Sequence, residues 1–109
     1  LEDPGLCYVE VKNVTLKREN RAEFPDSVTS RGAKHLRELI EMVKEGHRAV
    51  MVYLVQRADC DYFTVAGDID PKYAEGLKEA IEGGVEVLCY QCKLSEEEIL
   101  LDKPLEIRI

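Results

Sequence analysis

The segment from Cys7 to Leu16 alternates in polarity with the period of two that is typical of a β-strand. This period places three apolar residues on one face, namely Cys7, Val9 and Val11. Beyond Tyr8, the opposite face carries Glu10 and Lys12 side by side, about 7 Å apart along the strand. After Asn13 the apolar residues move to even positions, which predicts a bulge or short bend of the kind often found beside active sites.

Two segments have the apolar repeat of three to four residues that predicts amphipathic helices. The first begins within residues 26–30, where several side chains can cap it, and ends at about Glu45. Gly46 then provides the expected left-handed stop. The second begins at Asp70-Pro71, a cap followed by proline at the first helical position, and ends at Gly83-Gly84.

The other apolar segments predict strands. Residues Ala49–Val55 are apolar on both faces, as in a central strand that is covered on both sides. Val85–Cys92 predicts another buried strand, Tyr62–Val65 a short one, and the alternating Leu105–Ile109 an edge strand. The charged segment Lys17–Ala22 has no apolar pattern and is interpreted as a loop.

Strands separated by helices predict right-handed crossovers and a mostly parallel α/β sheet. With 109 residues, the chain is expected to form one domain that buries a core without disulfides. It contains no run of about 18 apolar residues and no signal peptide, so neither a membrane span nor secretion is predicted. The four cysteines lie mostly in apolar segments, which indicates buried free thiols and a reducing cytoplasm.

The net charge of −7 argues against a protein that binds nucleic acid through overall positive charge. The charge is unevenly distributed, however. Residues 1–48 contain nine basic and nine acidic residues, whereas residues 49–109 contain six basic and thirteen acidic ones. The half of the chain that contains Glu10 and Lys12 is therefore neutral and carries local basic clusters.

A glutamate and a lysine two residues apart on one strand form the pair that divalent-metal nucleases use as metal ligand and charge stabiliser. The carbonyl of Val11 can add a ligand at the same edge. The alternative interpretation is an ordinary ion pair between Glu10 and Lys12 on a half-solvated strand. A second carboxylate would normally come from a preceding strand, and Asp3 lies too close to provide it. We interpret Asp26 as a helix cap or as a residue that supports the site.

Arg31, Lys34 and His35 occupy the first turns of the first helix. Basic residues at the positive end of a helix oppose the usual charge preference and indicate an anion bound there. The alternative is a solvated helix face with ion pairs to Glu38 and Glu41. Cys89-x-x-Cys92 is interpreted as structural, because residues three apart in a strand face opposite sides.

Four segments occur in an order and spacing that resemble the C-terminal domain of the sugar fermentation stimulation protein (SfsA) family. They are CYVEVKNVTL, FPDSVTSRGAKHLRELIEMVKEG, AVMVYLVQ and DIDPKYAEGLKEAIEGGVEVLCY. The resemblance covers essentially the whole chain. It implies a restriction-endonuclease-like, PD-(D/E)xK fold: a mixed, mostly parallel central sheet flanked by two main helices.

The family is described as DNA-binding, and its E-x-K residues match Glu10 and Lys12. Its basic segment on the following helix matches Arg31, Lys34 and His35. The first motif aspartate and an OB-like N-terminal domain would precede Leu1. The resemblance therefore implies a Mg²⁺ or Mn²⁺ site to which this chain alone binds the ion weakly or not at all.

From this we expect a cytoplasmic DNA-binding protein with a divalent-metal, phosphodiesterase-like site, linked by family to the regulation of sugar fermentation. Nuclease activity is left open, and this chain alone is expected to be inactive. One alternative is a non-catalytic DNA-binding or regulatory module, and another is a protein-interaction scaffold whose acidic second half docks partners. DNA is the expected partner, no membrane is expected, and a homodimer is left open.

Overall fold

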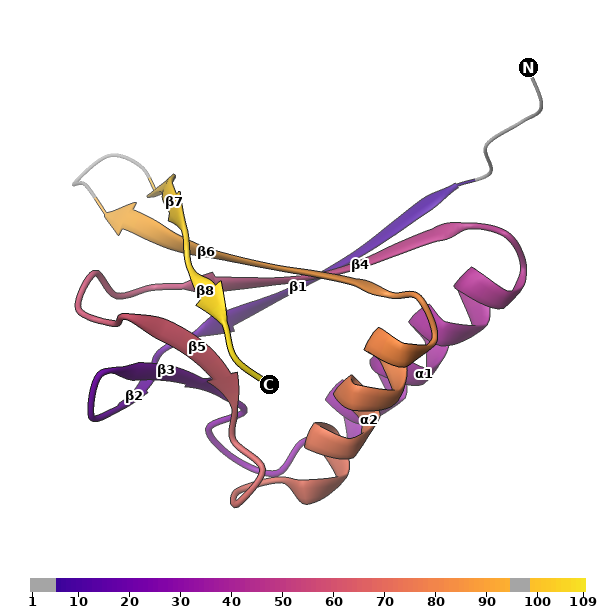
Figure 1. Cartoon of the computed structure of the whole chain (residues 1–109), viewed down its shortest axis with the longest axis horizontal. Coiled ribbons are helices and arrows are strands. Elements are labelled where there is room, and N and C mark those ends of the chain that lie inside the picture. The colour runs from indigo at the N-terminus through magenta and orange to yellow at the C-terminus, as the bar shows by residue number, and fades with distance from the viewer. Residues whose placement is uncertain (1–5, 95–98) are drawn as a thin grey trace.

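The computed structural model describes residues 6–94 and 99–109, which form eight strands and two helices (Figure 1). The elements are β1 (Cys7–Val14), β2 (Leu16–Arg18), β3 (Arg21–Phe24), α1 (Ser30–Lys44), β4 (Arg48–Val55), β5 (Tyr62–Val65), α2 (Pro71–Glu82), β6 (Glu86–Leu94), β7 (Ile99–Pro104) and β8 (Glu106–Ile107). Both predicted helices are therefore confirmed, as are the predicted strands that became β4, β5 and β6. Asp3, which was interpreted as too close to provide a second carboxylate, lies outside the described residues.

The strands form two four-stranded sheets, ordered β1-β4-β6-β7 and β2-β3-β5-β8. In the first sheet β1, β4 and β6 are parallel and β7 is antiparallel to β6. In the second, β3, β5 and β8 are parallel and β2 is antiparallel to β3. The predicted mixed, mostly parallel α/β architecture is confirmed, although its strands are divided between two sheets.

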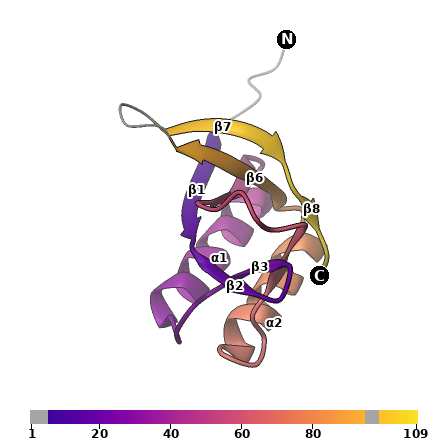
Figure 2. The same ribbon diagram turned by 90° about the vertical axis from the view of Figure 1, so that its left-hand side faces the viewer.

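Both helices lie together on one side of the first sheet (Figure 2). Helix α1 connects β3 to β4, and α2 connects β5 to β6. Each helix therefore leads the chain from the second sheet back to a strand of the first. The opposite face of the β1-β4-β6 unit is not covered by either helix, and Val52 and Leu54 of β4 are only half-buried there. Val50 on the same face is buried, so the expectation that β4 is covered on both sides holds only in part. Neither helix of the described chain is long and apolar enough to cross a membrane.

Helix α1 is capped by Thr29, whose hydroxyl accepts a hydrogen bond from the Gly32 amide at 3.0 Å. The cap satisfies one of the amides that have no partner within the helix. Asp26 is exposed and does not cap the helix, so this part of its interpretation is wrong. At the other end Gly46 has a φ of 93°, which confirms the predicted left-handed stop.

The cap of α2, Asp70, is buried and also fixes the start of α1. One carboxylate oxygen accepts from the Tyr73 amide at 3.1 Å, as in an ordinary N-cap. The other accepts from the Thr29 amide at 2.8 Å. A single side chain therefore holds the first turns of both helices next to each other.

Strand β1 pairs with β4 in one unbroken register, from Cys7 opposite Arg48 to Val14 opposite Val55. Of the bulge or short bend predicted at Asn13, the bulge is therefore absent, and the chain passes from the first sheet to the second only after Val14. The even-numbered residues of β1 face the helices, and Val14 is the buried end of that same face. The apparent change of phase arises because Leu16 already belongs to the second sheet.

The predicted loop Lys17–Ala22 is instead the hairpin of β2 and β3. Glu19 makes the tight turn with a φ of 57°. The carboxylate of Glu23, which is only 4% exposed, is paired with Arg18. Arg18 in turn binds Asp68 at 2.6 Å. One local ion pair and one long-range ion pair, together with the pairing of β3 with β5, thus stabilise a hairpin in a segment that has no apolar pattern of its own.

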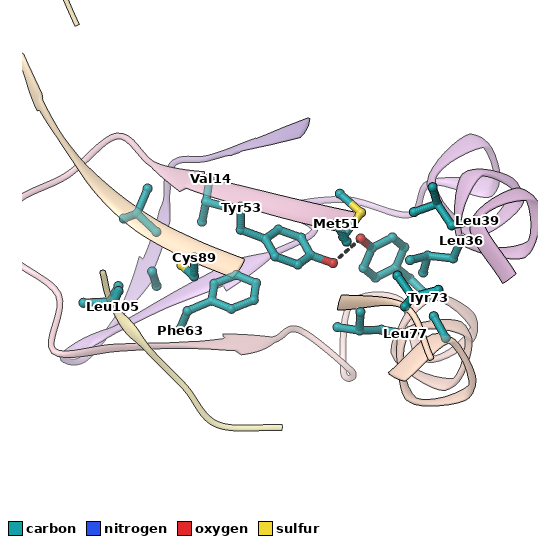
Figure 3. Packing of buried hydrophobic residues seen from close by; sticks show 14 of the residues in the cluster. Val14, Leu36, Leu39, Met51, Tyr53, Phe63, Tyr73, Leu77, Cys89 and Leu105 are labelled. Atoms are coloured by element: carbon teal, nitrogen blue, oxygen red, sulfur yellow. Dashed lines mark hydrogen bonds between the residues drawn. The ribbon is translucent and has the colours of Figure 1, made fainter. Parts of the chain in front are cut away.

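The core lies between the two sheets and the helices and is centred on aromatic residues (Figure 3). Tyr53 of β4 stacks on Phe63 of β5 with ring centroids 4.5 Å apart. The hydroxyl of Tyr53 is 2.5 Å from that of Tyr73 on α2, and both side chains are fully buried. The pair satisfies two polar groups that would be costly to bury alone.

The cysteines divide into one exposed and three buried residues. Cys7 is exposed on β1, so the expectation of buried thiols is wrong for this residue. Cys60, Cys89 and Cys92 are buried and free, and burial raises the pKa of Cys89 to about 12. Cys89 and Cys92 were expected to face opposite sides of the sheet because side chains alternate along a strand. A register shift between Gln91 and Cys92 interrupts that alternation.

The buried tyrosine pair predicts a loss of stability at alkaline pH. Burial raises the pKa of Tyr73 to about 12 and also raises that of Tyr53. Below about pH 10, the ordinary value, this contribution is fully present. Between about pH 10 and pH 12 the unfolded chain releases protons that the folded chain retains, so the free energy of unfolding should fall by about 1.4 kcal/mol per pH unit for each tyrosine.

Denaturant unfolding across this pH range measures the slope. The matched control is the double variant Tyr53→Phe/Tyr73→Phe, which removes both hydroxyls together and should make the curve flatter. Identical slopes for the two proteins would contradict the assignment of this effect to the pair.

Candidate functional site

Glu10, Lys12 and His35 form a compact polar cluster between β1 and α1. Lys12 Nζ is 3.3 Å from Glu10 Oε1, and His35 Nδ1 is 3.1 Å from the same oxygen. The side chains are 32%, 17% and 20% exposed, respectively, so solvent reaches all three. The structure therefore brings together three of the predicted site residues, and it also contains the ion pair of the alternative interpretation.

One nitrogen of His35 contacts both other members of the cluster. Lys12 Nζ also lies 3.1 Å from His35 Nδ1. With a proton on Nδ1, His35 donates to Glu10; without that proton, Nδ1 accepts from Lys12. The position of a single proton therefore decides which partner holds the imidazole.

The Val11 carbonyl lies on the open edge of the described sheet. Leu6, just before β1, and Val14, at its end, are both even-numbered. Their carbonyls point toward β4 and accept hydrogen bonds from the amides of Arg48 and Gln56. Because successive carbonyls along a strand point in opposite directions, Val11 directs its carbonyl away from β4. This orientation leaves the oxygen accessible at the edge.

Glu10 and the Val11 carbonyl are the groups here that could hold Mg²⁺ or Mn²⁺. A carboxylate and a carbonyl are oxygen ligands of the kind these ions prefer, and Mg²⁺ commonly keeps several waters beside one or two carboxylates. Lys12 and His35 both contact Oε1 of Glu10. Within the described residues, no group of three or more His, Cys, Asp and Glu side chains is arranged to hold a metal ion. The donor set thus fits a site that is completed by water, phosphate or residues beyond this range.

A cationic hollow of about 590 Å³ adjoins this cluster on α1. Its lining consists of Ser30, Arg31, Lys34, His35 and Arg37. Lys34 Nζ is also 4.0 Å from Glu38 Oε1. This ion pair is the one expected under the alternative interpretation, in which the basic residues form only a solvated helix face. Sequence reasoning did not single out Arg37, although basic residues recur every third position at 31, 34 and 37.

A second hollow of about 260 Å³ lies on the other side of His35. Glu10, His35 and Glu38 all contribute to its lining, together with apolar residues of β1 and α1. His35 is therefore shared by an acidic hollow and a cationic one. Asp26 is exposed and lines neither hollow, and its supporting role remains a prediction.

The parallel strands, the two crossover helices and the polar edge of β1 define an α/β domain of the restriction-endonuclease-like class. The chain belongs to the sugar fermentation stimulation protein family. The family model described as "Sugar fermentation stimulation protein RE domain" matches residues 1–98. The resemblance drawn from the four sequence segments is thereby confirmed.

Curated relatives support the same assignment. The sugar fermentation stimulation protein homolog of Rhodospirillum centenum is 63% identical over 110 residues, which cover 98% of this chain and 47% of the relative. That of Paramagnetospirillum magneticum is 60% identical over 99 residues, covering 91% of this chain and 42% of the relative. The chain thus spans about half the length of the curated relatives it matches.

Among solved structures, the chain is similar to one described as "The structure of Pyrococcus Furiosus SfsA in complex with Ca2+". The TM-score is 0.87 with 34% sequence identity. The match covers 94% of this chain and 45% of that one. Nearly all of this chain therefore shares its fold with slightly less than half of the Pyrococcus furiosus protein.

Gly32 lies in the first turn of α1, where the backbone packs closely against Thr29 and against Tyr73 of α2. A Cβ at this position would lie 2.8 Å from Thr29 Cγ2 and 3.1 Å from Tyr73 Cε2. We therefore expect Gly32→Ala to lower the free energy of unfolding by about 1–3 kcal/mol, although alanine favours helix.

Gly76→Ala on α2 is the matched control. Its Cβ would meet Leu36 Cδ1 at 3.5 Å, an ordinary contact. This change should stabilise the protein by about 0.5–1 kcal/mol through helix propensity alone. Equal effects of the two substitutions in denaturant unfolding would show that the close approach at Gly32 is unimportant.

Proposed function

We propose that this domain binds DNA through the cationic hollow on α1, with a backbone phosphate placed against the Glu10–Lys12–His35 cluster. The observation that carries this proposal is that His35 lines the cationic hollow while contacting Glu10 and Lys12. Phosphate-binding side chains and the metal-ligand candidate thus form one continuous surface.

The basic residues of this surface lie at the beginning of α1. The amides of the first turn carry partial positive charge, which adds to the charge of Arg31 and Lys34. The first turn contains no acidic residue. Local attraction for phosphate is therefore compatible with a net charge of −7, which is concentrated in the second half of the chain.

Within this proposal, Glu10 and the Val11 carbonyl hold a divalent cation. The related Pyrococcus furiosus protein was solved in complex with Ca²⁺, another divalent cation bound by oxygen ligands. Such an ion, when bound, supplies positive charge against the phosphate and acidifies a bound water. Lys12 donates hydrogen bonds to a phosphate oxygen, and His35 accepts or donates a proton at Nδ1.

A non-catalytic DNA-binding or regulatory domain is the second candidate function. It is favoured by the fact that the cluster contains one carboxylate, Glu10, whose Oε1 already pairs with Lys12 and His35. A regulatory role also suits the name of the family, which refers to stimulation of sugar fermentation. DNA binding is common to both candidates, and turnover distinguishes them.

Lys34→Ala should weaken DNA binding to all sequences alike and reduce the slope of log affinity against log salt by about 1, because one phosphate contact is lost. Lys44→Ala is the matched control, since Lys44 lies on the last turn of the same helix and its side chain is 67% exposed against 68% for Lys34. Anisotropy with a labelled duplex over a salt series measures both. Indistinguishable slopes for the two variants would make Lys34 an ordinary surface charge, and an absence of DNA binding by the parent chain would favour the scaffold alternative.

Glu10→Gln should weaken Mn²⁺ binding at least about tenfold, because the neutral amide retains the shape of the side chain but removes the anionic ligand. Glu41→Gln, an exposed carboxylate on the outer side of α1, serves as the control and should leave the affinity unchanged. Isothermal titration calorimetry measures both affinities in a full-length family polypeptide that carries this domain, because the chain alone is expected to bind the ion weakly or not at all. Equal Mn²⁺ binding by that polypeptide with Glu10 and with Glu10→Gln would exclude Glu10 as a ligand.

A plasmid-nicking assay in Mn²⁺ then distinguishes the two candidate functions. Nicking that is abolished by Lys12→Ala would establish the nuclease. Salt-dependent DNA binding without nicking, in a full-length family polypeptide as well as in this chain, would establish the regulatory domain instead.

A further inference from the structure

The face of the first sheet that points away from the helices is apolar across three strands. The register of β1, β4 and β6 places Val11, Val52 and Leu88 in one row, with further rows on either side. The apolar members of this outer face are Val9, Val11, Val50, Val52, Leu54, Leu88 and Tyr90.

Several of these side chains are open to solvent. Val9 is 56% exposed, Val11 49% and Leu88 42%. No helix of the described chain covers this face, because α1 and α2 both pack on the opposite one (Figure 2). Parallel strands are normally covered on both faces, and a contiguous exposed apolar surface of this kind usually marks an interface.

Family members provide a candidate cover within their own polypeptide. The matched region accounts for 47% of the Rhodospirillum centenum relative and 45% of the Pyrococcus furiosus chain. In both, more than half of the polypeptide lies outside the domain described by residues 6–94 and 99–109. That portion is held at a high effective concentration because it is covalently linked to this domain.

We propose that the outer face is an intramolecular packing surface, covered in full-length family polypeptides by the portion of the chain outside the matched half. The covering surface is apolar at its centre. At its rim it meets the exposed Arg48–Glu86 ion pair, whose two hydrogen bonds are both 2.9 Å long. This inference is independent of DNA binding, which uses the other side of the sheet.

A second copy of the chain is the competing occupant. Two copies would each bring a net charge of −7, and their repulsion opposes association at low ionic strength. The linked portion of the same polypeptide does not depend on protein concentration. Concentration dependence therefore separates the two occupants.

The test compares the rate of thiol labelling at two matched positions. Leu88→Cys and Ile81→Cys introduce thiols at apolar sites that are 42% and 41% exposed, the first on the outer face and the second on α2. Cys7→Ser removes the exposed native thiol, while the other three cysteines are buried. Each variant is made in this chain and in a full-length chimera in which the chain replaces the matched half of the Rhodospirillum centenum relative.

We expect position 88 to be labelled at least about tenfold more slowly in the chimera than in the chain alone, with position 81 labelled equally in both. Val9→Cys repeats the measurement on β1, and circular dichroism establishes that each variant is folded. Equal labelling at positions 88 and 9 in chain and chimera would overturn the proposal. Protection that already occurs in the chain alone and increases with its concentration would also overturn it, in favour of a second copy.

Discussion

The buried carboxylate of Asp70 is the interaction on which the arrangement of the site depends. It accepts one hydrogen bond from the start of α1 and one from the start of α2, and so fixes two segments that are 41 residues apart in the sequence. His35 and the cationic residues of α1 are placed by this contact and by the close approach at Gly32. An unpaired acid at this depth would cost several kcal/mol, so both hydrogen bonds are needed to keep it buried.

The elements that could be predicted from the sequence are those whose signals are local. Caps, apolar periodicity and glycine stops lie within a few residues of each other, and they gave both helices and the central strands. The hairpin of β2 and β3 could not be predicted, because Glu23 is stabilised as a buried strand residue by arginines of the same hairpin and, through Arg18, by Asp68. The exposure of the outer face of β1 could not be predicted either, because alternation separates the two faces of a strand but does not show which one the helices cover.

The candidate site shows the same division. Glu10 and Lys12 share a strand face, so their proximity followed from a period of two. That His35 joins them depends on how α1 crosses β1, which no local pattern specifies. Asp26 was favoured as a cap because it is near the helix in sequence, whereas the carboxylate that supports the start of α1 comes from Asp70.

The adjacent starts of α1 and α2 have a consequence for how quickly a charged ligand arrives. Asp70 holds both helix starts together, and the helices lie side by side. Their peptide dipoles therefore add, whereas the dipoles of an antiparallel pair would cancel. The Asp70 carboxylate lies at both positive ends and offsets much of their partial charge, so Arg31, Lys34 and Arg37 supply most of the positive potential in this region of an otherwise acidic protein. Such a polarised field orients an approaching polyanion and raises its association rate, an effect that weakens as ionic strength increases.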